Sequence, residues 1–84
     1  MPLDKGDFIK PGDFAAPRKD AFRVVYSLPR DTIMGELGRR YRYGGDYVSP
    51  EKAREHAMEH VGATWGVYDH EGRQVDSSDG LVPA

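Results

Sequence analysis

The segment from Ser49 to Gly62 restricts the possible folds of this chain more than any other part of the sequence. Ser49 can cap free backbone amides, Pro50 suits the first helical position, and Glu51 meets the positive end of a helix dipole. Gly62 is the type of residue that commonly follows the end of a helix. Because these start and stop signals are independent and agree, they predict one main helix over about residues 50–61.

One face of this predicted helix is suited to close packing. On a helical wheel Ala53, Ala57 and Val61 lie together, and small alanines allow a helix to approach a sheet closely. We therefore expect these three side chains to be buried. Glu55 and Glu59 lie away from them and are expected to face solvent.

The clearest strand signal precedes the helix. In residues 21–28 the apolar side chains Phe22, Val24, Tyr26 and Leu28 occupy every second position. Alternation with a period of two places these side chains on one face of an extended segment. The pattern predicts a half-buried strand.

Three shorter segments are also expected to be extended, namely residues 39–43, 63–69 and 73–75. The glycine-rich step at 44–46 predicts a bulge or a turn after the first of them. The turn at 70–72 joins the other two as a hairpin. Trp65 lies in the second segment and is expected to be the largest core residue.

The elements follow one another as strand, short helix or turn, strand, helix, strand, strand. The short helix or turn is predicted from an Asp31-Thr32 cap followed by Ile33 and Leu37 on one face. One good helix among strands favours an α+β fold. We expect a small antiparallel sheet of three to four strands with the helix packed on one face.

Residues 1–20 are predicted to form an extended arm. Three prolines and two glycines in this stretch forbid a long helix. Phe8 and Phe14 each follow a Gly-Asp pair and are expected to act as apolar anchors. The arm either packs on its own domain or docks on a partner. The single α+β domain then covers residues 21–78, followed by a frayed tail at 79–84.

Composition narrows the class of protein. Eighty-four residues leave room for one domain, and the absence of cysteine removes disulfides, thiolate zinc sites and thiol nucleophiles. The first residues lack the apolar segment of a secretory signal, and no run approaches the length of a membrane span. We therefore expect a cytoplasmic protein without membrane association. Nucleotide-binding and serine-hydrolase spacings are missing, so we expect no enzyme activity and no cofactor.

The predicted helix contains His56, Glu59 and His60 in the H-x-x-E-H spacing of the inverted zinc proteases. Two histidines four residues apart on a helix can bind one metal ion. A catalytic zinc site needs a third protein ligand, however, and only 24 residues follow His60. We interpret the pattern as a helix surface with no metal. A zinc-dependent enzyme at these three residues is the weaker alternative.

Arginine and tyrosine are concentrated where a partner would bind. The candidate contacts are Arg39, Arg40, Arg42, Tyr43 and Tyr47, which belong to residue types enriched at protein interfaces. We expect Arg40 and Arg42 to point away from the core, because the tyrosines between them claim the opposite face of the strand. Such a strand can also grip phosphates and stack bases, so a single-stranded nucleic-acid-binding domain is an alternative. The net charge of −2 disfavours that alternative.

Charge is unevenly distributed along the chain. Residues 1–44 carry nine basic and six acidic side chains, whereas residues 45–84 carry three and eight. Segregation of this kind favours contact with an oppositely charged surface. We predict a small cofactor-free protein-binding module: an accessory subunit, an adaptor or an inhibitor of a larger complex, of the kind that phages and mobile elements encode. Its partner is expected to be another protein or a second copy of the chain.

Overall fold

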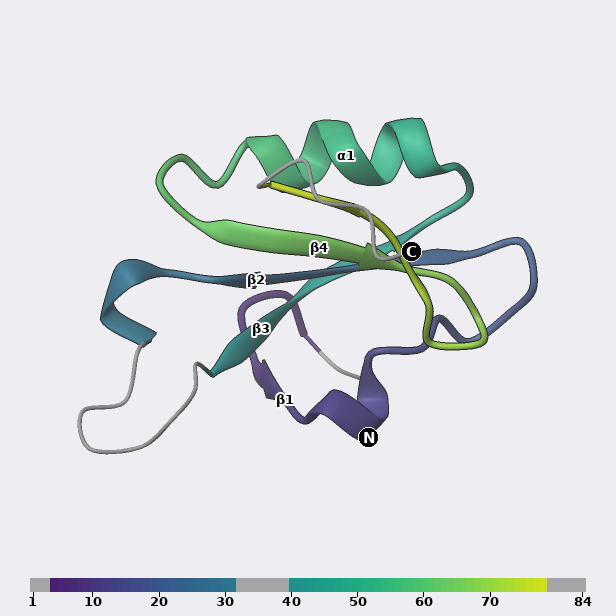
Figure 1. The fold of residues 1–84 in the computed structure, drawn as a ribbon, viewed down its shortest axis with the longest axis horizontal. Helices are drawn as coiled ribbons and strands as arrows, with labels where there is room; N and C mark the ends of the chain where they lie inside the picture. Colours follow the sequence, from purple (N-terminus) through teal and green to yellow (C-terminus); the bar gives the residue numbers. More distant parts are fainter. Residues whose placement is uncertain (1–3, 32–39, 79–84) are drawn as a thin grey trace.

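Five antiparallel strands form one sheet, and one α-helix covers a face of it (Figure 1). The structure, a computed structural model, describes residues 4–31 and 40–78. Its strands are β1 (Phe8–Ile9), β2 (Phe22–Ser27), β3 (Tyr41–Tyr47), β4 (Thr64–Tyr68) and β5 (Gln74–Ser77). Their order across the sheet is β1-β3-β2-β4-β5, and each neighbouring pair is antiparallel. The predicted α+β class is confirmed, with β1 as a strand that the sequence did not predict.

The helix α1 (Pro50–Met58) begins where the sequence predicts. The Ser49 hydroxyl accepts a hydrogen bond from the Lys52 amide at 3.2 Å, which satisfies one of the free donors of the first turn. Ala53 and Ala57 are fully buried, as expected. The helix therefore lies close to the sheet through its two alanines.

The end of the helix differs from the prediction. The last helical residue is Met58, because the amides of Glu59 and His60 bond to carbonyls three residues earlier, in a tighter turn than that of an α-helix. Gly62, with a φ of 82°, then directs the chain toward β4. Val61 lies beyond the regular helix, so the helical wheel no longer sets its direction. It is 92% exposed, and its predicted burial is wrong.

The main core lies between α1 and the sheet. Val24 and Tyr26 of the central strand β2 are buried there, and Phe22 and Leu28 pack against the same cluster. The predicted alternation of this strand is confirmed. Trp65 on β4 belongs to the cluster and is 6% exposed, so its predicted place in the core is also confirmed.

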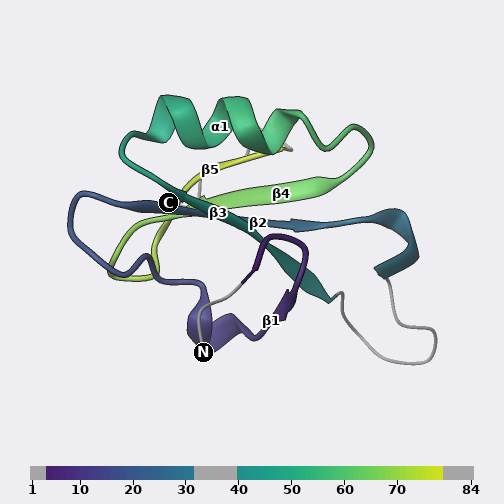
Figure 2. The same cartoon turned by 180° about the vertical axis from the view of Figure 1, so that it is seen from behind.

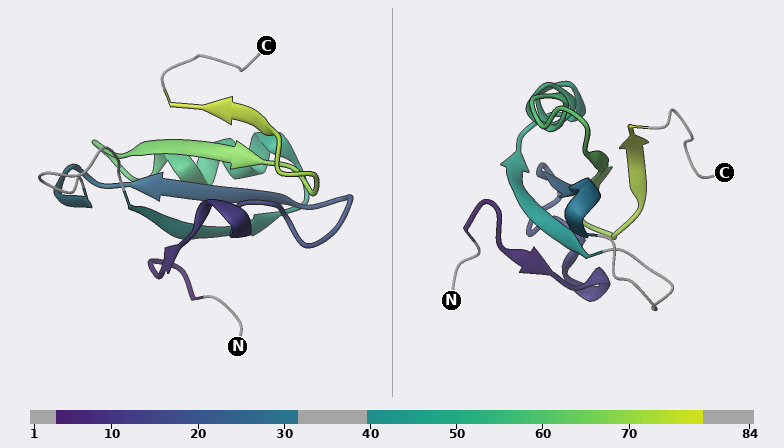
Figure 3. Two further views of the ribbon diagram at one scale, coloured as in Figure 1. Left: turned by 60° about the horizontal axis from the view of Figure 1, so that its bottom comes forward. Right: turned by 90° about the vertical axis from the view of Figure 1, so that its left-hand side faces the viewer.

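The arm covers the opposite face of the sheet (Figure 3). After β1 the chain forms the short 3-10 helix η1 (Pro11–Asp13). Ile9 and Ala16 are buried, and the ring of Phe14 contacts two tyrosines of β3 and β4, with centroids 5.4 and 5.0 Å apart. The same layers are visible from behind, with α1 above the sheet and the arm below it (Figure 2). Ile9, Phe14 and Ala16 thus pack on their own domain, whereas Phe8, also predicted to be an apolar anchor, is 49% exposed.

β3 is irregular where the sequence predicts a bulge or a turn. The register between β2 and β3 shifts between Arg23 and Val25, so β3 carries one residue more than β2 at this point. Gly45 has a φ of 104°, a conformation that favours glycine. A side-chain carbon at Gly44 would lie only 2.6 Å from the Val24 side chain. The bulge is therefore confirmed, and it depends on glycine.

Some predictions fall outside the described residues. These are the short helix or turn from Thr32 onward, the partner contact at Arg39 and the frayed tail at 79–84. Before the first of them the chain forms a second 3-10 helix, η2 (Pro29–Asp31). Within the part of the chain that the structure describes, no helix is long and apolar enough to cross a membrane.

Candidate interaction surface

Arg42 lies on the opposite face of the sheet from its neighbours Tyr41 and Tyr43 on β3, as their alternation predicts. Directly opposed residues of antiparallel strands share a face. Arg42 is opposed to Tyr26, whose ring lies in the helix-side core, whereas Tyr43 is opposed to Val25 on the arm side. Because the arm covers that second face, Tyr41 and Tyr43 lie beneath the arm, whereas Tyr47, beyond the bulge, faces α1.

Arg42 does not project freely into solvent, so this part of the prediction is wrong. Its Nε and Nη2 donate to the two carboxylate oxygens of Asp31 at 2.9 and 3.0 Å, and its Nη1 donates to the Gly6 carbonyl at 3.0 Å. The Asp31 side chain is 3% exposed and also accepts the Leu28 amide at 2.9 Å. Alternation along β3 identifies the face, but η2 and the turn before β1 bring the acceptors to it. Arg42 thereby connects three segments of the chain.

Both members of this ion pair are charged at neutral pH. The hydrogen bonds from Arg42 lower the pKa of Asp31 and outweigh burial, which acts in the opposite direction. The same hydrogen bonds raise the pKa of Arg42. The bidentate geometry fixes the plane of the guanidinium, so one of its faces is available for a ring.

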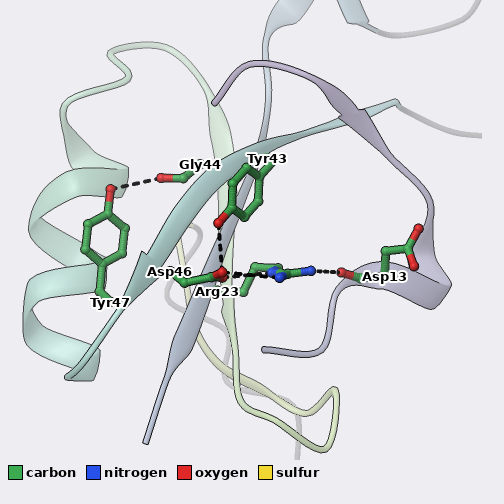
Figure 4. Close-up of polar contacts among 6 residues, drawn as sticks. All are labelled: Asp13, Arg23, Tyr43, Gly44, Asp46 and Tyr47. Carbon is green, nitrogen blue, oxygen red and sulfur yellow. Dashed lines mark hydrogen bonds and ion pairs between the residues drawn. The ribbon is translucent and has the colours of Figure 1, made fainter. Parts of the chain in front are cut away.

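On the arm side a second network engages Tyr43 (Figure 4). The Arg23 guanidinium donates to the two carboxylate oxygens of Asp46 at 2.8 and 3.2 Å, and to the Asp13 carbonyl of the arm at 2.7 Å. The Tyr43 hydroxyl donates to the same carboxylate at 2.7 Å. Burial, together with this hydrogen bond, raises the pKa of Tyr43 to about 12. The phenol therefore stays protonated and holds the arm-side network together.

The two histidines in the zinc-protease spacing stack on different tyrosines. The rings of His56 and Tyr47 lie 4.3 Å apart and those of His60 and Tyr26 lie 3.8 Å apart, both nearly parallel. The Tyr47 hydroxyl donates to the Gly44 carbonyl at 3.0 Å (Figure 4). Among the residues that the structure describes, no group of three or more histidine or acidic side chains is placed to hold a metal ion. The observed role of both imidazoles is to join α1 to the sheet.

Phe8 on β1 and Arg40, which directly precedes β3, are both exposed. Phe8 lies on the edge strand β1 directly opposite Arg42, and it is 49% exposed. The guanidinium carbon of Arg42 lies 4.3 Å from the centroid of the Phe8 ring, and that of the exposed Arg40 lies 5.6 Å from it. Within residues 4–31 and 40–78, no carboxylate forms an ion pair with Arg40. We call Phe8, Arg40 and Arg42 the β1 patch.

Asp31 is the residue of this region whose role the sequence did not reveal. Its position before an apolar segment predicts a helix cap, but its carboxylate accepts hydrogen bonds from Leu28 and Arg42 instead. An acidic residue close in sequence to several arginines is the signal that could have suggested an ion pair. That signal does not identify which arginine comes near.

Comparisons with protein-family models, with curated proteins and with solved structures find no match for this chain. Inferences about its function therefore start from the contacts described above.

Proposed function

We propose that the chain is a small protein-binding module that acts by contact, with the β1 patch at the centre of its docking surface. The observation that carries the proposal is the half-exposed ring of Phe8, which lies within 5.6 Å of the guanidinium carbons of both Arg40 and Arg42. Aromatic and arginine side chains are the types that most often dominate the energy of protein interfaces. A second copy of the chain is the other protein partner that the sequence allows.

The patch is rigid on one side and adaptable on the other. Arg42 is fixed by Asp31 and Gly6, so the Phe8 ring rests on a guanidinium that does not have to be ordered on binding. Such preorganisation lowers the entropic cost of association. Arg40 is exposed and has no carboxylate partner among residues 4–31 and 40–78, so it can pair with a group on the partner.

Tyr43 and Tyr47 have a supporting place in this proposal. Their hydroxyls donate within the fold, and their rings contact Arg23 and His56. Partner contacts by these two tyrosines stay a prediction. The other large apolar residues exposed among those described are Val48, Met58 and Val61, none of which is aromatic.

Site-specific photo-crosslinking tests the proposal. Phe8 is replaced by the photoreactive p-benzoylphenylalanine, and the protein is irradiated in lysate of the source cell. A matched control carries the same group at Met58, which is similarly exposed on α1. We expect a discrete protein adduct from position 8 that excess unlabelled wild-type protein competes away, and none from position 58.

Two results would contradict the proposal. One is the absence of a competed adduct at position 8, and the other is an equal adduct from both positions. An adduct that nuclease removes would favour the nucleic-acid alternative instead.

A further inference from the structure

We infer that the β1 patch accepts an acidic protein segment in extended conformation, which pairs with the open side of β1. This inference rests on the proposed function and specifies the chemistry of the partner. It depends on the direction of the β1 backbone, on the charge around Asp31 and on the guanidinium groups over the Phe8 ring.

The backbone of Phe8 points toward the open edge of the sheet. The Tyr43 amide donates to the Asp7 carbonyl at 2.8 Å, so residue 7 occupies a hydrogen-bonded position of the β1–β3 pair. Bonded positions alternate along antiparallel strands, which turns the amide and carbonyl of Phe8 away from β3. Among the described residues, no strand pairs with β1 on that side. An extended chain can therefore add there through main-chain hydrogen bonds.

The charge around this edge is positive. Arg30 and Arg40 are exposed, and Arg42 adds a third guanidinium close to the carboxylate of Asp31. The Arg40 amide donates to the Asp31 carbonyl at 3.0 Å, and Arg30 precedes Asp31 in the chain, so the backbones of both arginines lie next to that of this one buried acid. Asp31 is bonded to Arg42 and neutralises one charge. The surplus favours an acidic partner and disfavours a basic one.

Acidic residues of the arm leave this surplus in place. Asp4 and Asp7 lie in the turn before β1, where the Asp7 carboxylate accepts the Asp4 amide at 3.2 Å. Because side chains alternate along a strand, the Asp7 carboxylate lies on the opposite side of the chain from the Phe8 ring. Among the described residues, neither Asp4 nor Asp7 forms an ion pair with Arg40.

The same geometry argues against two other occupants. Two copies of the chain meeting through this patch would bring like charges together. A nucleic-acid base needs a free aromatic face to stack on, and the guanidinium carbons of Arg42 and Arg40 already lie over the Phe8 ring at 4.3 and 5.6 Å. An acidic peptide meets neither obstacle. Its charge is opposite to that of the patch, and it contacts the Phe8 backbone, the ring edge and Arg40 rather than a ring face.

Selection from a random peptide library displayed on phage tests the inference. Wild type, Arg40→Glu and the control Lys19→Glu serve as baits. Lys19 is exposed in the link before β2, whose first residue pairs with the far end of β3, so the control changes the same charge away from β1. We expect wild type and Lys19→Glu to select peptides rich in Asp and Glu. Arg40→Glu should bind the selected peptides at least about tenfold more weakly.

Backbone pairing is tested with one selected peptide. Its residues are N-methylated one at a time, which removes single amide donors without changing charge. We expect one methylation to abolish binding, and amide NMR shifts on titration to centre on Phe8 and Arg40. The inference is wrong if the selected peptides are not acidic, if Arg40→Glu binds them as tightly as wild type, or if every methylated peptide still binds.

Failure of the inference and failure of the proposed function give different results. If position 8 crosslinks to a protein but the peptide experiments fail, the docking surface stands and its preference for an acidic strand does not. If position 8 gives no competed adduct, the docking surface itself is wrong. If a short poly-deoxythymidine oligonucleotide suppresses the position 8 adduct and an acidic peptide does not, the patch binds nucleic acid.

Discussion

At the scale of single residues, His56 and His60 explain why the zinc-protease spacing arises on this helix. Residues four apart project on the same side of a helix, which is the requirement for binding one metal ion. It is also the requirement for lying against neighbouring strands. In the structure each imidazole stacks on a tyrosine, one on β3 and one on β2. His56 lies on α1, whereas His60 follows the end of the helix at Met58, so helical spacing does not set the direction of His60 and the two imidazoles contact different tyrosines.

The partly buried position of His60 leads to a prediction about pH. Burial lowers the pKa of His60 below its usual value of 6.5; nearby Lys5 acts in the same direction and Glu59 opposes it. The native state therefore favours the neutral imidazole. As the pH falls below 6.5, the unfolded chain takes up the proton first, so the free energy of unfolding decreases until the pH is below the native pKa.

His60→Phe supplies the comparison, because it keeps a ring for Tyr26 and cannot titrate. We expect its stability relative to wild type to increase as the pH falls from 6.5, measured by urea unfolding at a series of pH values. A difference that stays constant with pH, or an NMR titration of His60 with a midpoint above 6.5, would contradict the prediction.

At the scale of elements, β1 is the strand that the sequence did not predict. Two residues in a proline- and glycine-containing arm carry no periodic signal, because alternation needs several residues to be recognised. Their pairing with Tyr41 and Arg42 is a tertiary event. The pleat nevertheless separates the two side chains, since Ile9 is buried and Phe8 is half-exposed.

This separation predicts that alanine substitutions at these two neighbouring positions lower the free energy of unfolding by different amounts. Ile9→Ala should lower the free energy of unfolding by about 2 kcal/mol, because it removes a buried side chain and leaves a cavity. Phe8→Ala should cost less than about 1 kcal/mol, the scale of an exposed cation–π contact, yet it should remove the position 8 contact with a partner. Chemical denaturation measures both values. Equal losses of stability from the two variants would show that Phe8 is a structural residue and would weaken the proposed docking surface.

At the scale of the whole molecule, the arm and α1 enclose the sheet from two sides. Val24 on the helix side and Val25 on the arm side are both fully buried, so β2 has no solvent-facing side along this stretch. The Arg23 bond to the Asp13 carbonyl and the Phe14 ring contacts hold the arm in place. Small domains bury a limited fraction of their surface, so a second covered face is a substantial part of the total.

Deleting residues 1–15 should therefore destabilise the protein. We expect a loss of ~2–4 kcal/mol, the scale for uncovering a buried isoleucine and one aromatic ring, with the transition remaining cooperative. Urea unfolding followed by tryptophan fluorescence measures the loss, because Trp65 lies in the helix-side core. A truncated protein that unfolds at the same urea concentration as the full chain would show that the arm adds no stability.

The sequence by itself determined the elements whose signals are local. The cap at Ser49, the alternation of β2, the alanine face of α1 and the glycine bulge of β3 each arise from backbone or side-chain preferences over a few residues. Local preferences of this kind do not depend on what lies opposite. For that reason the α+β class and the opposite faces of Arg42 and Tyr43 could be predicted.

Only the tertiary structure decided what covers each face and which charges meet. Asp31 and Arg42 are eleven residues apart, and Arg23 and Asp46 are 23 apart, so no helical or strand period relates them. No local period predicts β1 either, because this strand forms by pairing with the edge of β3. The β1 patch could not be predicted for this reason. Its residues were visible in the sequence, but the exposure of Phe8 and the pairing of Arg42 depend on chain segments that only folding brings together.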